Sequence, residues 1–303
     1  MKTAYLGTSD FAATVLRRLA GSSHRPTLVV TPPDRRQGRG RKVQPPPAAL
    51  AAQELDLALL QAENVNDEEA LGRIRAAAPE AVIVCAFGQL IREPLLSEFP
   101  LLNVHPSLLP RWRGAAPIER AIMAGDPVTG VCVMQLTAGL DSGPVALCEE
   151  VAIEPDEDFG SLAARLADRG GDLLVRALDL QAQGALEFTE QDEGRVTYAE
   201  KIEAGERRLD PDRPAAELAA KVRALTPHIG SYLELPEGDR LGVRRAHAVE
   251  PIEAVAAGRL AAHEGALLLG CGEGALRLEV VQPPGGKPMP ADAYLRGHPL
   301  PGT

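Results

Sequence analysis

Short apolar runs alternate with amphipathic runs through the first 180 residues, and this alternation limits the folds open to the chain. The apolar runs have the length of strands, and the amphipathic runs have the length of helices. Repeated strand–helix units build a parallel sheet whose right-handed crossovers place helices on both faces. We therefore predict an α/β fold with a doubly wound, largely parallel, Rossmann-like sheet. The predicted strands are 3–6, 27–30, 58–60, 81–87, 101–105, 130–136 and 145–151, and the predicted helices are 11–20, 48–55, 67–77, 117–124 and 159–183.

The character of the sequence changes after the last of these helices. Residues 184–208 are polar and charged, which predicts a linker around a short ordered TYAEKI segment. Beyond a helix at 215–225, short apolar runs separated by Gly and Pro indicate a small β-barrel or sandwich. We therefore predict a first domain at 1–183, a linker at 184–208 and a smaller β domain at 209–303.

Charge is distributed unevenly along the chain. The net charge is −10, with 20 Lys and Arg against 30 Asp and Glu in residues 1–206, and 12 of each in residues 207–303. This balance disfavours general nucleic-acid binding, which depends on neutralising phosphates. Residues 34–42 depart from it, because they hold five basic side chains and one acid. A basic loop on an acidic body predicts a local contact with a polyanion.

The chain shows no signature of export, membrane insertion or metal binding. It begins without a signal-peptide or transit-peptide pattern, and no apolar run approaches the roughly 20 residues of a membrane span. We therefore expect a cytoplasmic protein. The four cysteines at positions 85, 132, 148 and 271 form no CxxC pair, so neither a zinc site nor a disulfide framework is predicted. Three of the four lie in apolar strand-like runs and are expected in the core.

The run NVHPSLLPRWRG places Asn103 and His105 two residues apart at the end of a predicted strand. Side chains two apart share a face of a strand, so the amide and the imidazole should project together. Open parallel sheets bind ligands at the carboxyl ends of their strands. Asp141, in the turn-like GLDSGP, is a third candidate whose carboxylate can orient the imidazole. We predict an active site made of these three residues.

A nicotinamide-binding site is disfavoured, because the first turn reads Gly7-Thr8-Ser9-Asp10 and lacks the GxGxxG pattern. A module that binds RNA or a small ligand without catalysis is a second alternative. It is disfavoured because a binding module has no need of the Asn, His and Asp together.

The run NVHPSLLPRWRGAAPIERAI followed by GLDSGP resembles the folate-dependent formyltransferases. The resemblance extends to the opening YLGTSDFAA, the basic PDRRQGRGRK, the FGQLI segment and VTYAEKI, so it covers nearly the whole chain. It implies an OB-like barrel at the carboxyl end. It also implies transfer of a formyl group from 10-formyltetrahydrofolate, without a metal, to the α-amino group of initiator methionyl-tRNA, by a monomer.

The resemblance also implies roles for individual residues. Asn103, His105 and Asp141 are the catalytic set, and Arg39, Arg41 and Lys42 are expected at the tRNA. Arg111 and Arg113 are expected as solvated rim charges or as tRNA contacts. The residues expected at the folate are Ser107, Leu108, Leu109, Pro110, Phe87 and Leu90.

A formyltransferase or hydrolase that uses 10-formyltetrahydrofolate on a small substrate is the main alternative. The three catalytic residues do not separate it from a tRNA-modifying enzyme. The basic loop, the TYAEKI segment and the added β domain favour tRNA.

Overall fold

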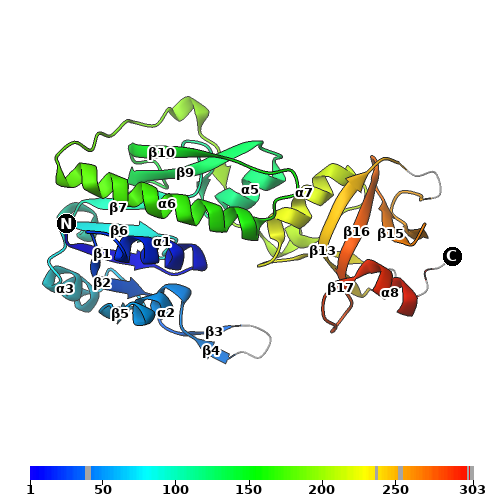
Figure 1. The fold of residues 1–303 in the computed structure, drawn as a ribbon, viewed down its shortest axis with the longest axis horizontal. Helices are drawn as coiled ribbons and strands as arrows, with labels where there is room; N and C mark the ends of the chain where they lie inside the picture. The colour runs from blue at the N-terminus through cyan, green and yellow to red at the C-terminus, as the bar shows by residue number, and fades with distance from the viewer. Residues whose placement is uncertain (38–41, 236–237, 252–254, 299, 301–303) are drawn as a thin grey trace. The chain divides into compact units, whose positions relative to one another are not determined.

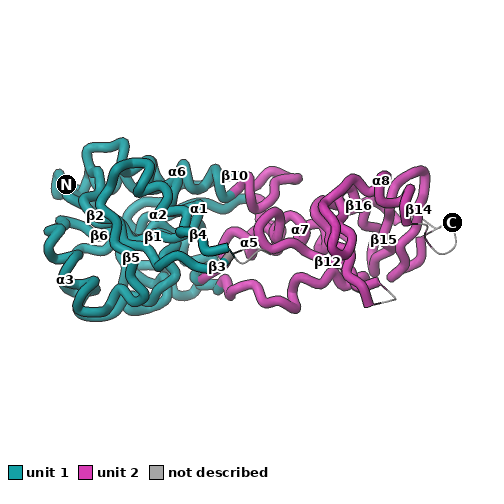
Figure 2. The backbone as a smooth tube through the Cα atoms, turned by 90° about the horizontal axis from the view of Figure 1, so that it is seen from below, with its two compact units in different colours: residues 1–114, 128–152, 163–198 teal, residues 115–127, 153–162, 199–303 magenta. Residues whose placement is uncertain are grey.

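The computed structural model describes residues 1–37, 42–235, 238–251, 255–298 and 300. Backbone contacts divide the chain into two compact units, which are coloured separately in Figure 2. The first unit consists of residues 1–114, 128–152 and 163–198, and the second of residues 115–127, 153–162 and 199–303. Each unit is described by itself below.

The first unit is built on a seven-stranded sheet with the order β10-β9-β7-β6-β1-β2-β5 (Figure 1). The five strands from β7 to β5 run parallel to one another. The strand β9 pairs antiparallel with β7 on one side and with β10 on the other. Numbered in chain order, the five parallel strands are arranged 3-2-1-4-5, which is the classic Rossmann order without its sixth strand. The predicted largely parallel sheet is confirmed. The strands are β1 (Thr3–Gly7), β2 (Pro26–Thr31), β5 (Leu59–Gln61), β6 (Ala81–Cys85), β7 (Leu101–His105), β9 (Val128–Gln135) and β10 (Val145–Ala152).

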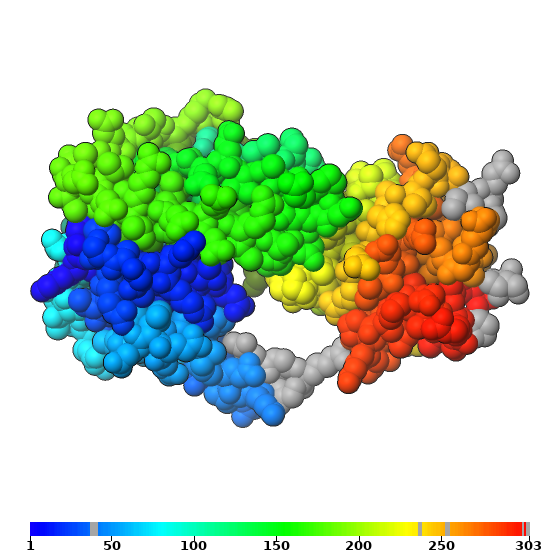
Figure 3. Space-filling view, viewed as in Figure 1, coloured from blue at the N-terminus to red at the C-terminus, as the bar shows by residue number. Residues whose placement is uncertain are grey.

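Helices lie beside the strands, and two of them pack side by side over one face of the sheet. These are α1 (Asp10–Ala20), whose N-cap Ser9 accepts from the Ala12 N–H, and α6 (Phe159–Ala182). They meet at Gly171, where an added Cβ would lie 2.7 Å from the Arg18 Cβ. Figures 1 and 3 show both helices on the viewed side. The other helices of this part are α2 (Pro47–Glu54), α3 (Glu68–Ala76) and α4 (Leu95–Glu98).

The strand β7 is buried on both faces, and its two faces have different uses. On one face Val104 packs against α6 so closely that a Cβ on Gly170 would lie 2.9 Å from the valine methyl. Leu101 belongs to the core on the opposite face, with Phe87 and Ile91. Because residues two apart share a face, Asn103 and His105 project on the side of Leu101, away from α6. The helix α6 therefore supports the strand from behind.

The cysteines depart in part from the expectation. Cys85 and Cys271 are buried thiols, as predicted. Cys132 and Cys148 form a disulfide, which the sequence analysis did not predict. The two residues stand directly opposite each other on β9 and β10, so strand register joins side chains that are 16 residues apart in sequence. Spacing alone gives no sign of such a cross-strand pair.

The basic loop is bounded by a short antiparallel hairpin of β3 (Arg35–Gln37) and β4 (Lys42–Gln44). Lys42 is exposed, and Arg35 is 67% exposed. Arg39 and Arg41 lie outside the described residues. The tRNA contacts assigned to this loop stay a prediction.

The second unit contains an antiparallel sheet with the order β12-β13-β16-β15-β14, and β17 pairs with β16. The helix α7 (Ala215–Leu225) contributes Leu218 and Val222 to the core beneath the sheet. The expected separate antiparallel β domain is confirmed, and its likeness to an OB barrel stays a prediction. The other elements are α5 (Pro117–Met123), β12 (Ser231–Glu234), β13 (Arg240–Val249), β14 (Leu260–His263), β15 (Ala266–Gly270), β16 (Ala275–Gln282), β17 (Met289–Pro290) and α8 (Ala291–Gly297).

The predicted linker at 184–208 holds short ordered elements. These are a 3-10 turn at Glu193–Arg195, the strand β11 (Tyr198–Ala199) and a second 3-10 turn at Ala204–Arg207. The strand β11 pairs with β8 (Arg113–Gly114), so this segment returns to the first unit. In the described ranges, no helix combines the length and the apolar character needed to cross a membrane.

Candidate active site

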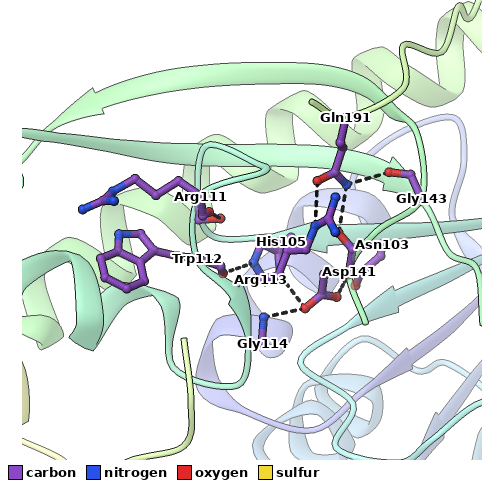
Figure 4. A network of polar contacts seen from close by, with 10 residues as sticks. Asn103, His105, Arg111, Trp112, Arg113, Gly114, Asp141, Gly143 and Gln191 are labelled. Carbon is purple, nitrogen blue, oxygen red and sulfur yellow. Dashed lines mark hydrogen bonds and ion pairs between the residues drawn. The ribbon is translucent and has the colours of Figure 1, made fainter. Parts of the chain in front are cut away.

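The structure brings Asn103, His105 and Asp141 together (Figure 4). The Asn103 Nδ2 lies 3.5 Å from Asp141 Oδ1, and the His105 Nδ1 lies 3.7 Å from Asp141 Oδ2. Asn103 and His105 are 7% and 4% exposed. An amide donor, a titratable ring and a carboxylate therefore share one small volume on β7. The two separations are long for hydrogen bonds, which is common at catalytic sites without substrate.

The backbone holds the Asp141 carboxylate in place. The Gly114 N–H donates to Asp141 Oδ2 over 2.9 Å. Asp141 itself has a φ of +43°, in the left-handed region that costs most residues about 1–2 kcal/mol and that Asp tolerates better than most. The segment around Asp141 is a turn between β9 and β10, which agrees with its turn-like sequence.

The carbonyl of Trp112 fixes the orientation of the His105 ring. Its oxygen lies 3.0 Å from His105 Nε2. A carbonyl oxygen only accepts hydrogen bonds, so Nε2 carries the proton in this contact. Nδ1 is then the nitrogen that faces Asp141.

The loop that supplies this carbonyl is held by residues far along the chain. The Trp112 N–H donates to Thr197 Oγ1, and the Arg113 N–H donates to the Thr197 carbonyl, each over 2.9 Å. Within the loop, the Ser107 hydroxyl donates to the Arg111 carbonyl over 2.6 Å. Trp112 has a φ of +67°, a strained conformation for a bulky residue that the surrounding contacts must maintain.

Arg113 departs from the expected rim charge, because it is 3% exposed. Its guanidinium donates to both carboxylate oxygens of Glu193, at 2.7 and 3.3 Å, and to Gln191 Oε1 at 3.0 Å. The hydrogen bonds from Arg113 lower the pKa of the Glu193 carboxyl. A buried guanidinium needs such partners, because an unpaired buried charge is costly. Arg113 is therefore an internal residue that binds Gln191 and Glu193 beside the site. Arg111, by contrast, is half-buried and stacks 4.3 Å over the ring of Trp112.

Gln191 and Glu193 were missed by the sequence analysis. They stand in the polar segment predicted as a linker, where no periodicity or motif distinguishes them from solvated residues. The nearby VTYAEKI segment, which the resemblance included, was the one sequence sign that this stretch returns to the fold.

The residues expected at the folate lie on two loops beside the site. Ser107 is fully buried, whereas Leu108, Leu109 and Pro110 are partly exposed. Phe87 is part of the core, and Leu90 is 64% exposed. Their contacts with a folate stay a prediction.

Two further observations bear on the chemistry of the site. Complete burial raises the pKa of Cys85 to about 12, so this thiol stays protonated and is a poor nucleophile. In the described part of the chain, no group of three or more His, Cys, Asp or Glu side chains is arranged to hold a metal ion.

Comparison with known proteins identifies the family. Residues 1–178 match the sequence profile described as formyl transferase, and residues 201–299 match the profile described as formyl transferase, C-terminal domain. The chain belongs to the formyl transferase family.

Curated formyl transferases match this chain over nearly its full length. A methionyl-tRNA formyltransferase from Halorhodospira halophila is 44% identical over 300 residues, which cover 98% of this chain and 96% of the relative. One from Methylobacillus flagellatus is 41% identical over 307 residues, which cover 99% of this chain and 97% of the relative.

Solved structures of distant sequence share the formyl transferase fold. HypX from Aquifex aeolicus in complex with tetrahydrofolic acid gives a TM-score of 0.65 at 16% identity, covering 97% of this chain and 47% of that chain. This chain therefore spans about half the length of HypX. An N-formyltransferase from Helicobacter canadensis in complex with folinic acid and dTDP-3-aminofucose gives 0.67 at 12% identity, covering 92% of this chain and 98% of that chain.

The contact with the Trp112 carbonyl predicts the tautomer of His105. At a pH where the ring is neutral, we expect the proton on Nε2, because the carbonyl offers only an acceptor. Nitrogen-15 NMR of the histidine rings, with the signal assigned by a His105→Gln variant, measures this directly. A neutral ring with its proton on Nδ1 would show that Trp112 does not orient the imidazole.

Proposed function

We propose that this protein transfers the formyl group of 10-formyltetrahydrofolate to the free α-amino group of initiator methionyl-tRNA. The observation that carries the proposal is the convergence of Asn103, His105 and Asp141. It occurs in a chain that matches methionyl-tRNA formyltransferases over nearly their whole length. The product is N-formylmethionyl-tRNA, which begins protein synthesis.

Asn103 is suited to stabilising negative charge. The folate co-substrate supplies an electrophilic formyl carbon, whose oxygen becomes more negative when an amine attacks. The Asn103 Nδ2 is a buried donor whose contact with Asp141 is long, at 3.5 Å, so it can turn toward that oxygen. A single donor of this kind contributes roughly 3 kcal/mol to transition-state stabilisation in comparable acyl-transfer sites.

His105 and Asp141 are suited to handling the proton that the amine loses. With Nε2 occupied by the Trp112 carbonyl, Nδ1 is the nitrogen that accepts the proton, and the imidazolium that results faces Asp141. The carboxylate then balances the charge. An α-amino group has a pKa of about 7.7 to 8.0, so roughly a tenth of it is already neutral at pH 7 and no strong base is required.

The surface beside the site suits the flat, largely apolar ring system of a folate. Leu90 and Leu140 are 64% and 62% exposed, although large apolar side chains are usually covered. They stand on loops whose other residues Phe87, Ile91 and Leu136 pack in one core cluster. We place the folate against these loops and Ser107–Pro110, with polar contacts from backbone groups.

We assign the tRNA contacts to the basic residues 35–42 and to the β domain at 209–303. Residues 1–183 form the proposed catalytic domain, and residues 184–208 form the proposed linker. Arg side chains can form paired hydrogen bonds with phosphates or stack on unpaired bases. Because the rest of the first 206 residues is acidic, the loop is a local point of attachment. We place the reaction in the cytoplasm, where aminoacyl-tRNA is used, and expect a monomer by gel filtration.

A formyltransferase or hydrolase for a small substrate shares the same three catalytic residues. To separate the two, the protein is incubated with 10-formyltetrahydrofolate and charged initiator or elongator methionyl-tRNA. We expect formylated initiator methionyl-tRNA as the main product. Release of formate without formylated tRNA, or transfer to small amines alone, would contradict the proposal.

Replacing Asn103 tests the role of the amide donor. Asn103→Ala should lower kcat by roughly 100-fold or more with KM little changed, because the donor acts on charge present mainly in the transition state. Steady-state kinetics with both substrates measure this. A variant that binds tRNA weakly but turns over at the wild-type rate would refute the assignment.

Replacing Arg39 tests the basic loop. Arg39→Ala should weaken the use of methionyl-tRNA and reduce the salt slope of tRNA binding by about 1, as expected for one lost phosphate contact. Slow hydrolysis of 10-formyltetrahydrofolate should remain near the wild-type rate. Arg176→Ala removes the same charge from an exposed position on α6 and serves as the control. Unchanged tRNA formylation by the Arg39 variant would assign tRNA recognition to the β domain.

A further inference from the structure

The side chain of Gln191 lies between the two loops that build the active site (Figure 4). Its Nε2 donates to the carbonyl of Asp141 over 2.8 Å and to the carbonyl of Gly143 over 2.7 Å. Its Oε1 accepts from the Arg113 Nε over 3.0 Å. All of these residues belong to the first unit.

The orientation of this amide follows from its partners. The guanidinium of Arg113 only donates, so it must face the amide oxygen. The two backbone carbonyls only accept, so they must face the NH₂ group. The three contacts together leave no ambiguity between the oxygen and the nitrogen of Gln191, and each contact has normal hydrogen-bond length.

The loop that Gln191 holds has an unfavourable conformation. Asp141 has a φ of +43°, and Gly143 is packed so closely that an added Cβ would lie 2.0 Å from the Gln135 carbonyl oxygen. The Gln135 N–H donates to the Pro144 carbonyl at the base of the loop. At the tip, Gln191 donates to two carbonyls two residues apart. A strained loop keeps such a shape only when surrounding contacts maintain it.

The second loop is connected to the first through the same side chain. Arg113 follows Trp112, whose carbonyl orients His105, and the Arg113 guanidinium is fixed by Glu193 as well as by Gln191. Gln191 thus joins the loop that carries Asp141 to the loop that orients His105. His105 Nδ1 lies 3.7 Å from Asp141 Oδ2, and one of these loops orients the ring while the other carries the carboxylate.

We propose that Gln191 is a positioning residue that sets the geometry of the His105–Asp141 pair through the Asp141 and Gly143 carbonyls. The inference rests on the proposed formyl transfer and adds a residue to it from the polar segment after α6. Gln191 acts indirectly, by holding the two loops in place. The residues proposed to contact the reacting groups are Asn103, His105 and Asp141. Displacements of about 1 Å in such a constellation can cost on the order of 100-fold in rate.

The test separates the two donor bonds from the acceptor bond. Gln191→Glu keeps an oxygen for Arg113, with an added charge that favours that contact, but it cannot donate to either carbonyl. We expect kcat to fall by roughly 10- to 100-fold, with the KM values for methionyl-tRNA and 10-formyltetrahydrofolate within about threefold of wild type. The pH profile of kcat should also shift, because the His105–Asp141 geometry changes. A loss of folded protein would lower kcat equally at every pH.

Gln183→Glu is the matched control, because it makes the same change at an exposed position just beyond α6. It should behave as wild type. Gln191→Met, neutral and of similar length, removes all three hydrogen bonds and keeps the proposal testable in case the added charge unfolds the Glu variant. Wild-type kcat in either Gln191 variant would overturn the proposal, and so would a defect explained wholly by unfolding of both. Absence of formyl transfer in the wild type would instead count against the proposed function.

Discussion

The carboxylate of Asp141 is the point where three segments of the first unit meet. The strand β7 brings Asn103 and His105 to it, and the loop after His105 brings the Gly114 N–H. Gln191, in the segment after α6, donates to the backbone carbonyl of Asp141. A carboxylate with only 14% of its side chain exposed needs such partners, because burying an uncompensated charge is costly. The contacts that compensate this buried charge also fix the direction in which the carboxylate points. One set of contacts therefore meets both the electrostatic and the geometric requirement.

The fold could be predicted from the sequence because local pattern decides it, and the same pattern put Asn103 and His105 on one face of a strand, whereas Asp141 was added from its turn-like segment and from the family resemblance. Apolar runs of strand length gave the parallel sheet, and the period of two on β7 placed Asn103 beside His105 and set both apart from Val104. The buried Arg113 could not be predicted, because an Arg in a loop is usually solvated and its partners lie about 80 residues away. Gln191 was missed for the same reason. The Cys132–Cys148 bridge depends on the register of β9 against β10, which sequence spacing does not report.

Stability and reactivity are divided between the two faces of β7. The face toward α6 is packed at the limit set by Gly170, which leaves no room for a side chain. The other face passes from the apolar core at Leu101 to the polar groups of Asn103 and His105 within four residues. A rigid strand supported from behind is what a preorganised donor requires, because its direction must not change when charge develops. Variation in acceptor substrate can then reside in the loops and in the second unit.

The long sequence separation within the site determines when it can form during synthesis. His105 leaves the ribosome 92 residues before Thr197, counting from 105 to 197, and Thr197 is among the residues that hold the loop carrying the Trp112 carbonyl. Synthesis adds about 5–20 residues per second and domains fold as units as they emerge, so several seconds pass between His105 and this segment. A nascent chain that ends with α6 therefore contains Asn103, His105 and Asp141 but still lacks Gln191 and Thr197. The contacts that complete this cluster depend on a segment that is synthesised after every strand of the sheet.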